Sequence, residues 1–331
     1  MRQRSIQEYV VRPCRTWSLI FTGIRLAAGV GILLAGLAQA QSPIATDRFV
    51  LHTARTSPLD LELGGELDGL PTGTTRYLTR EDLLKMPQST YTVTDDANFR
   101  GPTEISGVPL EELTKRLGAA PQSDMVVAIC DDQYRANYPR SYVEAHHPLL
   151  VLNINGKPPS GWPKDSEGLG MDMGPFLISH PKFVPSFRIL SHQDEPQIPW
   201  GLVRLEFRNE KMVYAAISPR SSHSSDTSVR DGYHIAQQNC FRCHNMGSEG
   251  GTKAGRPWLV LSSWATTLPE YFAAYVRNPH SKNPQANMPG NPGYDDKTIA
   301  ALTAYFRTFS SAFAKSPAVA SSTSGKRKGK P

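Results

Sequence analysis

The spacing of apolar residues divides the chain into a strand-rich first part and a helical last part. Between Leu59 and about Asn209, "LDLEL" and "VRLEF" alternate apolar and polar residues, as half-buried strands do. "MVVAIC" and "LLVLNING" are continuous apolar runs, which predict buried strands, and the second ends in an Asn-Gly turn. "LTREDLLKM" predicts a short helix, because its first Thr stands three residues before Asp82 as a capping residue. Residues 157–175 are crowded with Pro and Gly and predict a long loop.

The pattern changes after a serine-rich linker, which we place at residues 218–228. A helix is predicted behind a cap at Ser225 or Asp226, because apolar residues then recur at helical spacing as far as Cys240. Leu268–Asn278 predicts a second helix, with Pro269 in its first turn. A last helix is predicted to begin at Asp295 or Asp296 and to run to about Phe309. The chain therefore reads as multidomain, with an all-α domain at the end.

The first 40 residues have the pattern of an export signal. Arg2, Arg4, Arg12 and Arg15 precede an apolar run over residues 17–37, and "AQA" at 38–40 is a small-residue cleavage site. We predict a signal peptide over residues 1–40, with an uncleaved membrane anchor as the alternative. In both cases the remainder is expected to be periplasmic, and contact with the membrane is expected only if the signal is not cleaved.

The net charge of +6 comes from the two ends of the chain. The first 40 residues carry five Arg and one Glu, and the last 21 carry five Lys or Arg, which leaves residues 41–310 with a net charge of −3. A nucleic-acid-binding protein would need a basic face, so we expect no nucleic-acid partner. Residues 313–331 read as a disordered basic tail.

The segment "NCFRCHNM" contains the most specific motif of the chain, Cys240 and Cys243 followed by His244. A zinc site would need two further ligands at finger or ribbon spacing, and there is no second Cys pair. A redox dithiol normally lies at a helix start after a strand, whereas this pair comes at the end of a predicted helix. Covalent attachment of one haem remains, with the two thiols bound to it and His244 as an axial iron ligand.

Met288 in "ANMPG" is the best candidate for the second axial ligand. It lies in a loop between two predicted helices, and a thioether sulfur is a known haem ligand that raises the reduction potential. The alternative is that Met288 serves only in packing, as a single Met often does. Met246 is a poor rival, because it follows His244 by only two residues.

Residues 226–312 resemble a class I cytochrome c domain. The matching features are "DGYHIAQQNCFRCH", the "YFAAYVRNP" helix, the "NMPG" loop and the closing "TIAALTAYFRTF". The resemblance implies that Gly232 on the first helix packs against Tyr305 or Phe306 on the last. The segment "GSEGGTKAGRPW" departs from the family pattern, and we expect the backbone carbonyl of Pro257 to hold His244.

Residues 57–210 resemble the molybdopterin-binding fold of sulfite oxidases, which implies an α+β domain with a mixed sheet. The segments that carry this resemblance are "LDLELGGEL", "YLTREDLLKMPQSTYTV", "ISGVPLEELTKRLG", "VVAICDDQY", "HPLLVLNINGKPPS" and "GPFLISHP". The family's metal-ligating cysteine precedes the Gly-x-Pro-Leu helix, and the corresponding window here has no cysteine. Cys130 follows that helix on a predicted buried strand, so we expect it to pack as a small apolar residue.

Two functions from different classes follow. The first is an electron-transfer protein that carries single electrons on its haem, has no catalytic residues, and serves a redox partner protein as a component or partner of an oxidoreductase. The second is a molybdopterin-dependent oxidoreductase of a small oxyanion such as sulfite, with the haem as a relay. The missing cysteine argues against the second, whereas a tight pterin pocket lined by Arg135, Arg140 or Arg188 would favour it. We expect Asp131 and Asp132 in a solvated turn, His146 and His147 as a surface pair, and Met171 and Met173 in loop packing.

Overall fold

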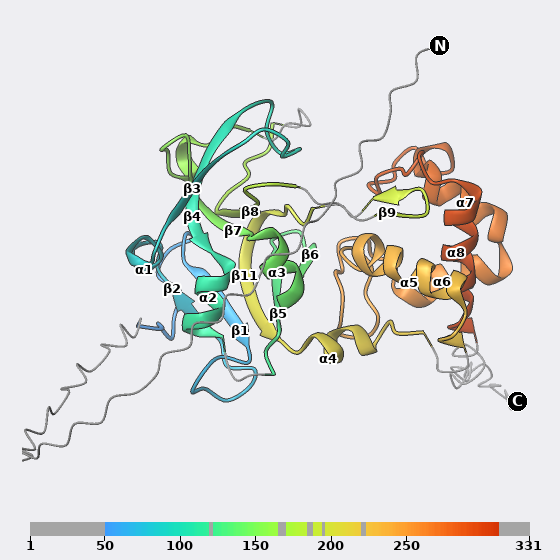
Figure 1. Ribbon diagram of the computed structural model, residues 1–331, viewed down its shortest axis with the longest axis horizontal. Coiled ribbons are helices and arrows are strands. Elements are labelled where there is room, and N and C mark those ends of the chain that lie inside the picture. The colour runs from blue at the N-terminus through green and yellow to red at the C-terminus, as the bar shows by residue number, and fades with distance from the viewer. Residues whose placement is uncertain are drawn as a thin grey trace, which may run out of the picture. The chain divides into compact units, whose positions relative to one another are not determined.

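The computed structural model describes residues 50–118, 122–164, 170–183, 188–193, 196–219 and 223–310. The predicted signal peptide and basic tail lie outside these residues. The described residues belong to one compact unit (Figure 1). We call residues 50–219 the sheet domain and residues 223–310 the helical domain.

Nine strands in the described part of the sheet domain form one mixed sheet. Its order is β2-β1-β11-β8-β7-β4-β3, with β5 paired to β11 and β6 paired to β5. β1 and β11 run parallel and the other pairs are antiparallel. The strands are β1 Leu61–Gly65, β2 Arg76–Leu78, β3 Ser89–Val93, β4 Thr103–Pro109, β5 Met125–Cys130, β6 Arg135–Pro139, β7 Leu149–Ile154, β8 Phe176–Ser179 and β11 Trp200–Arg208. The mixed sheet predicted for the first domain is thus confirmed.

Short helices accompany the sheet. They are α1 Arg80–Lys85, α2 Leu110–Leu117, α3 Arg140–His146, α4 Glu210–Ala215 and the 3-10 turn η1 Pro159–Gly161. The predicted start of α1 is confirmed, because the Thr79 hydroxyl accepts a hydrogen bond from the Asp82 amide at 3.1 Å and the Asp82 carboxylate accepts one from the Thr79 amide. α2 packs against β4, α3 packs against β6, and the two helices contact each other. Within the predicted loop, Met173 is buried in a hydrophobic cluster, whereas Met171 is exposed.

β5 explains why "MVVAIC" is apolar at every position. Val126 and Ala128 face the core of the sheet domain, whereas Met125, Val127 and Ile129 face a second core that they share with the helical domain. Side chains alternate between the two faces of a strand, so a strand that is polar on neither face must lie between two packed layers. Each of the Met, Val and Ile side chains contributes about 1.5–3 kcal/mol through burial. The predicted buried strand is confirmed.

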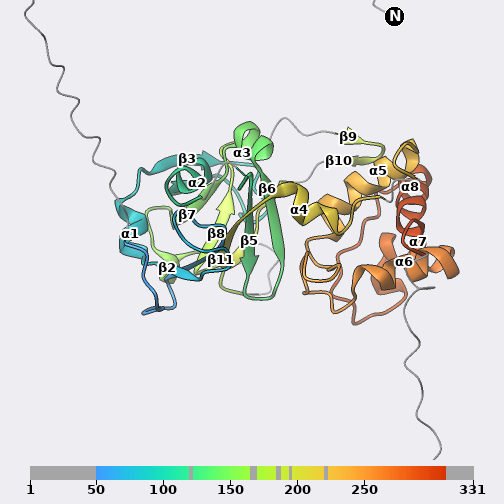
Figure 2. The same cartoon turned by 90° about the horizontal axis from the view of Figure 1, so that it is seen from below.

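The helical domain consists of α5 Thr227–Ile235, the π-helical turn η3 Ala236–Cys240, α6 Trp258–Thr267, α7 Pro269–Arg277, the 3-10 turn η4 Pro279–Ser281 and α8 Asp296–Arg307 (Figure 2). α5 and α8 cross at Gly232, where an added Cβ would lie 2.1 Å from the Ala301 carbonyl oxygen and 2.8 Å from the Tyr305 Cβ. The two backbones approach this closely because glycine has no side chain. The predicted packing of Gly232 against Tyr305 is confirmed.

A hairpin from the sheet domain, β9 Arg188–Ile189 and β10 His192–Gln193, lies against the helical domain. Ser191 in its turn hydrogen-bonds Thr298 on α8 at 2.5 Å and accepts a hydrogen bond from the Asp295 amide at 2.9 Å. The Asn239 amide nitrogen donates to His192 Nε2 at 2.7 Å, and His192 is 3% exposed. The hairpin therefore holds both the start of α8 and the turn that ends at Cys240.

Within the described ranges, the helices are too short or too polar to cross a membrane.

Candidate haem site

The three residues of the Cys-x-x-Cys-His motif lie together where the first helix of the helical domain ends. Asp226 caps α5, accepting hydrogen bonds from the amides of Ser228 at 2.8 Å and Val229 at 3.3 Å. The predicted cap is confirmed, although α5 already begins at Thr227, inside the predicted linker. The helix widens into the π-helical turn η3 and ends at Cys240. Such turns are rare and are frequent at functional sites.

Cys240 and Cys243 are free, half-buried thiols. The amides of Cys243 and His244 both donate to the Cys240 carbonyl oxygen, at 3.2 and 2.9 Å. This turn fixes two thiols and one imidazole on a single loop of backbone. The structure thus brings together three of the four predicted site residues.

His244 is held by the backbone of the loop that follows it. Its Nδ1 lies 2.7 Å from the carbonyl oxygen of Arg256, and the residue is 7% exposed. A carbonyl can only accept, so Nδ1 carries the hydrogen and Nε2 keeps the lone pair that binds a metal. Burial lowers the pKa of His244, which favours the same neutral form.

The prediction that Pro257 supplies this carbonyl was wrong by one residue. Pro257 is the N-cap of α6, and its carbonyl oxygen accepts the amide of Val260 at 2.9 Å. The last backbone carbonyl before α6 that is not used within the helix is therefore that of Arg256, and it accepts the hydrogen bond from His244.

The loop between His244 and α6 is tied to the motif by backbone hydrogen bonds. The Gly251 amide donates to the Phe241 carbonyl at 3.0 Å, and the Ala254 amide donates to the Cys243 carbonyl at 3.1 Å. Gly250 has φ of +89°, and an added Cβ would lie 2.6 Å from the Phe241 ring and 2.7 Å from the His244 carbonyl oxygen. Glycine is thus required at position 250, because the backbone there is left-handed and its neighbours leave no room for a side chain.

Met288 lies where the sequence places it, in the loop between η4 and α8, and its side chain is half-buried. Its pairing with His244 across an iron atom stays a prediction. Met246, the rival, packs against the core of the helical domain.

The residues around the motif fit a haem. Trp258 Nε1, Ser262 Oγ and Tyr275 Oη are buried and have no hydrogen-bond partner among the residues that the structure describes. Buried donors rarely remain unpaired, and the propionate groups of a haem are acceptors that would pair with them. The Arg256 guanidinium, 5.8 Å from the centre of the Tyr275 ring, adds a positive charge nearby.

The sheet domain contacts the haem-attachment loop directly. The Arg135 amide donates to the Arg242 carbonyl at 2.9 Å, and the Thr252 amide donates to the Gln133 carbonyl at 3.2 Å. Arg208 on β11 pairs with Glu249 at 2.6 Å. The sheet domain thus supports the loop that begins inside the motif and ends at the Arg256 carbonyl.

The β5–β6 turn was expected to be solvated. Asp131 and Asp132 are exposed, but Asp132 also forms an ion pair at 2.5 Å with Lys253 of the helical domain. The turn is therefore also part of the contact between the two domains.

The candidate residues predicted in the sheet domain do not gather at one site. Cys130 is 2% exposed at the end of β5, and burial raises the pKa of its thiol, as befits a residue that packs as an apolar side chain. Arg135 bonds the Ser248 carbonyl of the helical domain at 3.3 Å, and Arg188 bonds the Leu190 carbonyl at 3.0 Å in the β9 hairpin. Arg140 lines a shallow depression beside Tyr138. The structure does not bring these arginines together.

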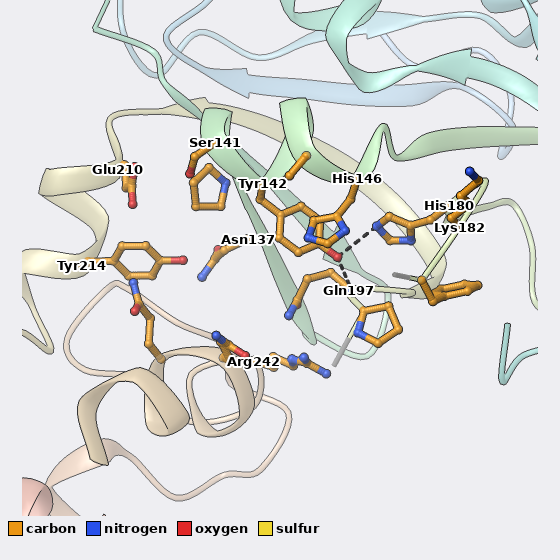
Figure 3. Close-up of a pocket in the computed structure, with 16 residues that line it drawn as sticks. Asn137, Ser141, Tyr142, His146, His180, Lys182, Gln197, Glu210, Tyr214 and Arg242 are labelled. Carbon is orange, nitrogen blue, oxygen red and sulfur yellow. Dashed lines mark hydrogen bonds between the residues drawn. The ribbon is translucent and has the colours of Figure 1, made fainter. Parts of the chain in front are cut away.

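A cavity that sequence reasoning missed lies where the two domains meet (Figure 3). His147 is exposed and pairs with Glu111 at 2.7 Å, but His146 is half-buried and lines this cavity, so the expected surface pair was half wrong. His180 lines the cavity as well, and it follows the buried strand β8. A histidine directly after the apolar run "PFLIS" was the signal that could have found it.

Comparison with protein families gives a match over the helical domain. Residues 227–306 match the family model described as cytochrome C oxidase, cbb3-type, subunit III. No curated protein matches the chain. One solved structure that matches is the sulfane dehydrogenase SoxCD from Paracoccus pantotrophus, with 18% identity and a TM-score of 0.31. The alignment covers 48% of this chain and 40% of that one, and likeness at this level carries no information on function. From its four helices, its Cys-x-x-Cys-His turn and the family match, the helical domain is a cytochrome c domain, the kind of domain that carries electrons on a haem.

Proposed function

We propose that the chain is a periplasmic c-type cytochrome that carries single electrons on one haem, as a component or partner of an oxidoreductase. Cys240 and Cys243 would hold the haem covalently, and His244 and Met288 would ligate its iron. The observation that carries the proposal is the hydrogen bond from His244 Nδ1 to the Arg256 carbonyl, directly after two free thiols. It presents the Nε2 lone pair of a neutral imidazole on the same turn as the two thiols.

When bound, the haem supplies reversible one-electron exchange. The residues of this chain position it and control its surroundings. The hydrogen bond to Arg256 orients the His244 ring and raises its basicity as a ligand. The buried rings of Phe241, Trp258 and Phe306 exclude water from this part of the domain, which together with a thioether ligand favours the reduced state.

The sheet domain acts in this proposal as a support for the cytochrome domain. Two backbone hydrogen bonds and the Arg208–Glu249 ion pair support the role, because all three end on the segment between Arg242 and Arg256. The partner that exchanges electrons with the haem is therefore expected to be a separate protein.

Export to the periplasm rests on the pattern of residues 1–40. Fractionation of a bacterial host and N-terminal sequencing of the mature protein test it. A mature chain that begins near Gln41 supports cleavage, and recovery of the intact chain in the cytoplasm contradicts export.

The central test is the metal and haem content of the protein made in a host competent for both haem attachment and molybdopterin synthesis. One iron per chain, a haem that survives acid-acetone extraction, and a visible spectrum that changes reversibly on reduction support the proposal. Molybdenum near one per chain would replace it with the enzyme alternative. Haem that is removed by the extraction would contradict covalent attachment.

A further inference from the structure

The loop that carries Met288 runs over residues 282–295, and we call it the Met288 loop. The structure describes all of this loop and gives it no helix or strand. The end of α7 holds its middle: the Asn291 amide donates to the Arg277 carbonyl at 3.0 Å, and Asn291 Nδ2 donates to the Val276 carbonyl at 3.1 Å. The helical domain itself therefore fixes the loop three residues after Met288.

The end of the Met288 loop is held by the β9–β10 hairpin of the sheet domain, which lies beside α5 and α8 (Figure 2). The Asp295 amide donates to the Ser191 hydroxyl at 2.9 Å, and the Ser191 amide donates to the Thr298 hydroxyl at 3.2 Å. The Thr298 hydroxyl donates to the Asp295 carboxylate at 2.7 Å, so the Ser191 hydroxyl supplies the hydrogen of its 2.5 Å contact with Thr298. The amide and the hydroxyl of Ser191 thus both bond the residues that start α8.

His192 connects the Met288 loop to the haem-attachment turn. The side-chain amide of Asn239, the residue before Cys240, donates to His192 Nε2 at 2.7 Å and to the Tyr294 hydroxyl at 2.8 Å. The rings of His192 and Tyr294 also meet edge to face, with 5.2 Å between their centres. Both residues are buried. A side chain of the sheet domain therefore lies where the attachment turn and the Met288 loop meet.

These contacts oppose opening of the loop. Segments without regular structure open locally at a lower free energy than helices and strands do. Met288 precedes Tyr294 by six residues and Asp295 by seven, so a chain end that moves away from the hairpin also frees the segment that carries the thioether. The loss of one buried hydrogen bond shifts such an opening equilibrium about two- to tenfold.

We propose that the β9–β10 hairpin holds the Met288 loop closed, with Ser191 and His192 as positioning residues. A second part rests on the proposed function. By holding the loop, the hairpin keeps Met288 on the iron and makes its replacement by an external ligand harder. The sheet domain thus acts on the side of the second axial ligand as well as on the segment between Arg242 and Arg256.

Hydrogen exchange measured by mass spectrometry on the full chain tests the first part. Peptides from residues 286–295 should exchange about two- to tenfold faster in Ser191→Ala and His192→Ala than in the wild type. His192→Gln should restore slow exchange, because its amide oxygen can accept the Asn239 donor. Gln193→Ala is the matched control, because Gln193 is the exposed neighbour of His192 and points to the other face of the strand.

Two results would overturn the first part. One is unchanged exchange of residues 286–295 in both alanine variants. The other is an equal increase in the peptide that contains β5, because the hairpin would then stabilise the whole chain rather than the loop.

The second part is tested by titrating the oxidised protein with imidazole while the sulfur-to-iron charge-transfer band is followed. The apparent Kd of imidazole should fall about two- to tenfold in Ser191→Ala and His192→Ala. It should stay at the wild-type value in Gln193→Ala and return toward it in His192→Gln. Faster exchange with a constant imidazole Kd would reject the coupling to the iron and keep the hairpin's role in holding the loop. A wild type that lacks the band would reject Met288 as a ligand, and the exchange experiment would still decide the role of the hairpin.

Discussion

The described part of the sheet domain contains one free cysteine and that of the helical domain contains two, and their surroundings differ. Cys130 lies at the end of β5, a strand whose two faces are both covered, and it is 2% exposed. Cys240 and Cys243 lie where a helix ends, on a turn that leaves both thiols half-buried beside an oriented imidazole. The burial of a cysteine and its place within its element together indicate whether it can bind a group.

The largest expected effect tests this contrast directly. Replacing Cys240 and Cys243 together by Ser should abolish covalent haem, because both thioether bonds are lost. Haem staining after denaturing electrophoresis measures this. Cys130→Ser is the matched control and should keep the full haem content. Stained protein from the double variant, or unstained protein from Cys130→Ser, would reverse the roles assigned to the cysteines.

Met288→Ala should leave the haem attached but remove the sulfur-to-iron charge-transfer band at the red end of the oxidised spectrum. It should also lower the reduction potential, because a thioether ligand favours ferrous iron. Met171→Ala is the control, since Met171 is an exposed methionine of the sheet domain. An unchanged band in Met288→Ala would remove Met288 from the site and direct attention to Met246.

Two glycines allow the stability of the domains to be compared. In Gly232→Ala the new Cβ would lie 2.1 Å from the Ala301 carbonyl oxygen, and in Gly107→Ala it would lie 1.9 Å from that of Leu150. Each change should lower the free energy of unfolding by about 1–3 kcal/mol, because backbone must move to relieve the overlap. Urea unfolding measures this, followed by haem absorption for the helical domain and circular dichroism for the whole chain.

The shared core around β5 predicts that both glycine variants shift both signals together. Gly101→Ala is the control, because open space surrounds that Cβ position, and it should change stability by less than about 0.5 kcal/mol. If Gly107→Ala shifts the circular dichroism and leaves the haem signal unchanged, the domains unfold independently.

The last prediction concerns pH. The pKa of His180 is lowered to about 3 in the folded chain, against about 6.5 when unfolded, so the unfolded chain binds the extra proton between these values. The contribution of neutral His180 to the free energy of unfolding is fully present above pH 6.5. Below pH 6.5 this free energy should fall by up to about 1.4 kcal/mol per pH unit. Urea unfolding at pH 7.5, 5.5 and 4.5 measures the slope. His180→Gln should flatten it, the exposed control His234→Gln should not, and equal slopes in all three proteins would contradict the assignment.

What could be predicted from sequence follows from how local each signal is. The α1 cap, the buried run of β5 and the motif at the end of η3 depend on residues within a few positions of one another, and all three were found. The acceptor of His244 was missed by one residue, because the capping role of Pro257 depends on where α6 begins. Such a shift is small along the chain and decisive for the chemistry.

Features that depend on distant residues gave no such signal. The network of Tyr142, His180 and Gln197 joins residues 38 and 55 positions apart. The β9–β10 hairpin has two-residue strands, too short for a periodic pattern, and its turn is held by Thr298, which is 107 residues away from Ser191. Only the fold brings these groups together, so sequence reading could not identify the cavity or the hairpin contact.

Two backbone hydrogen bonds join the domains, one from Arg135 to Arg242 and one from Thr252 to Gln133. They affect how the sequence of this protein can diverge during evolution. Amide and carbonyl groups are present at every position whatever the side chain, and among the common residues proline alone lacks the donor. Side chains around this contact can therefore drift while these two bonds persist. Homologues that differ at most interface positions should still keep these two hydrogen bonds, provided that residues 135 and 252 are not proline.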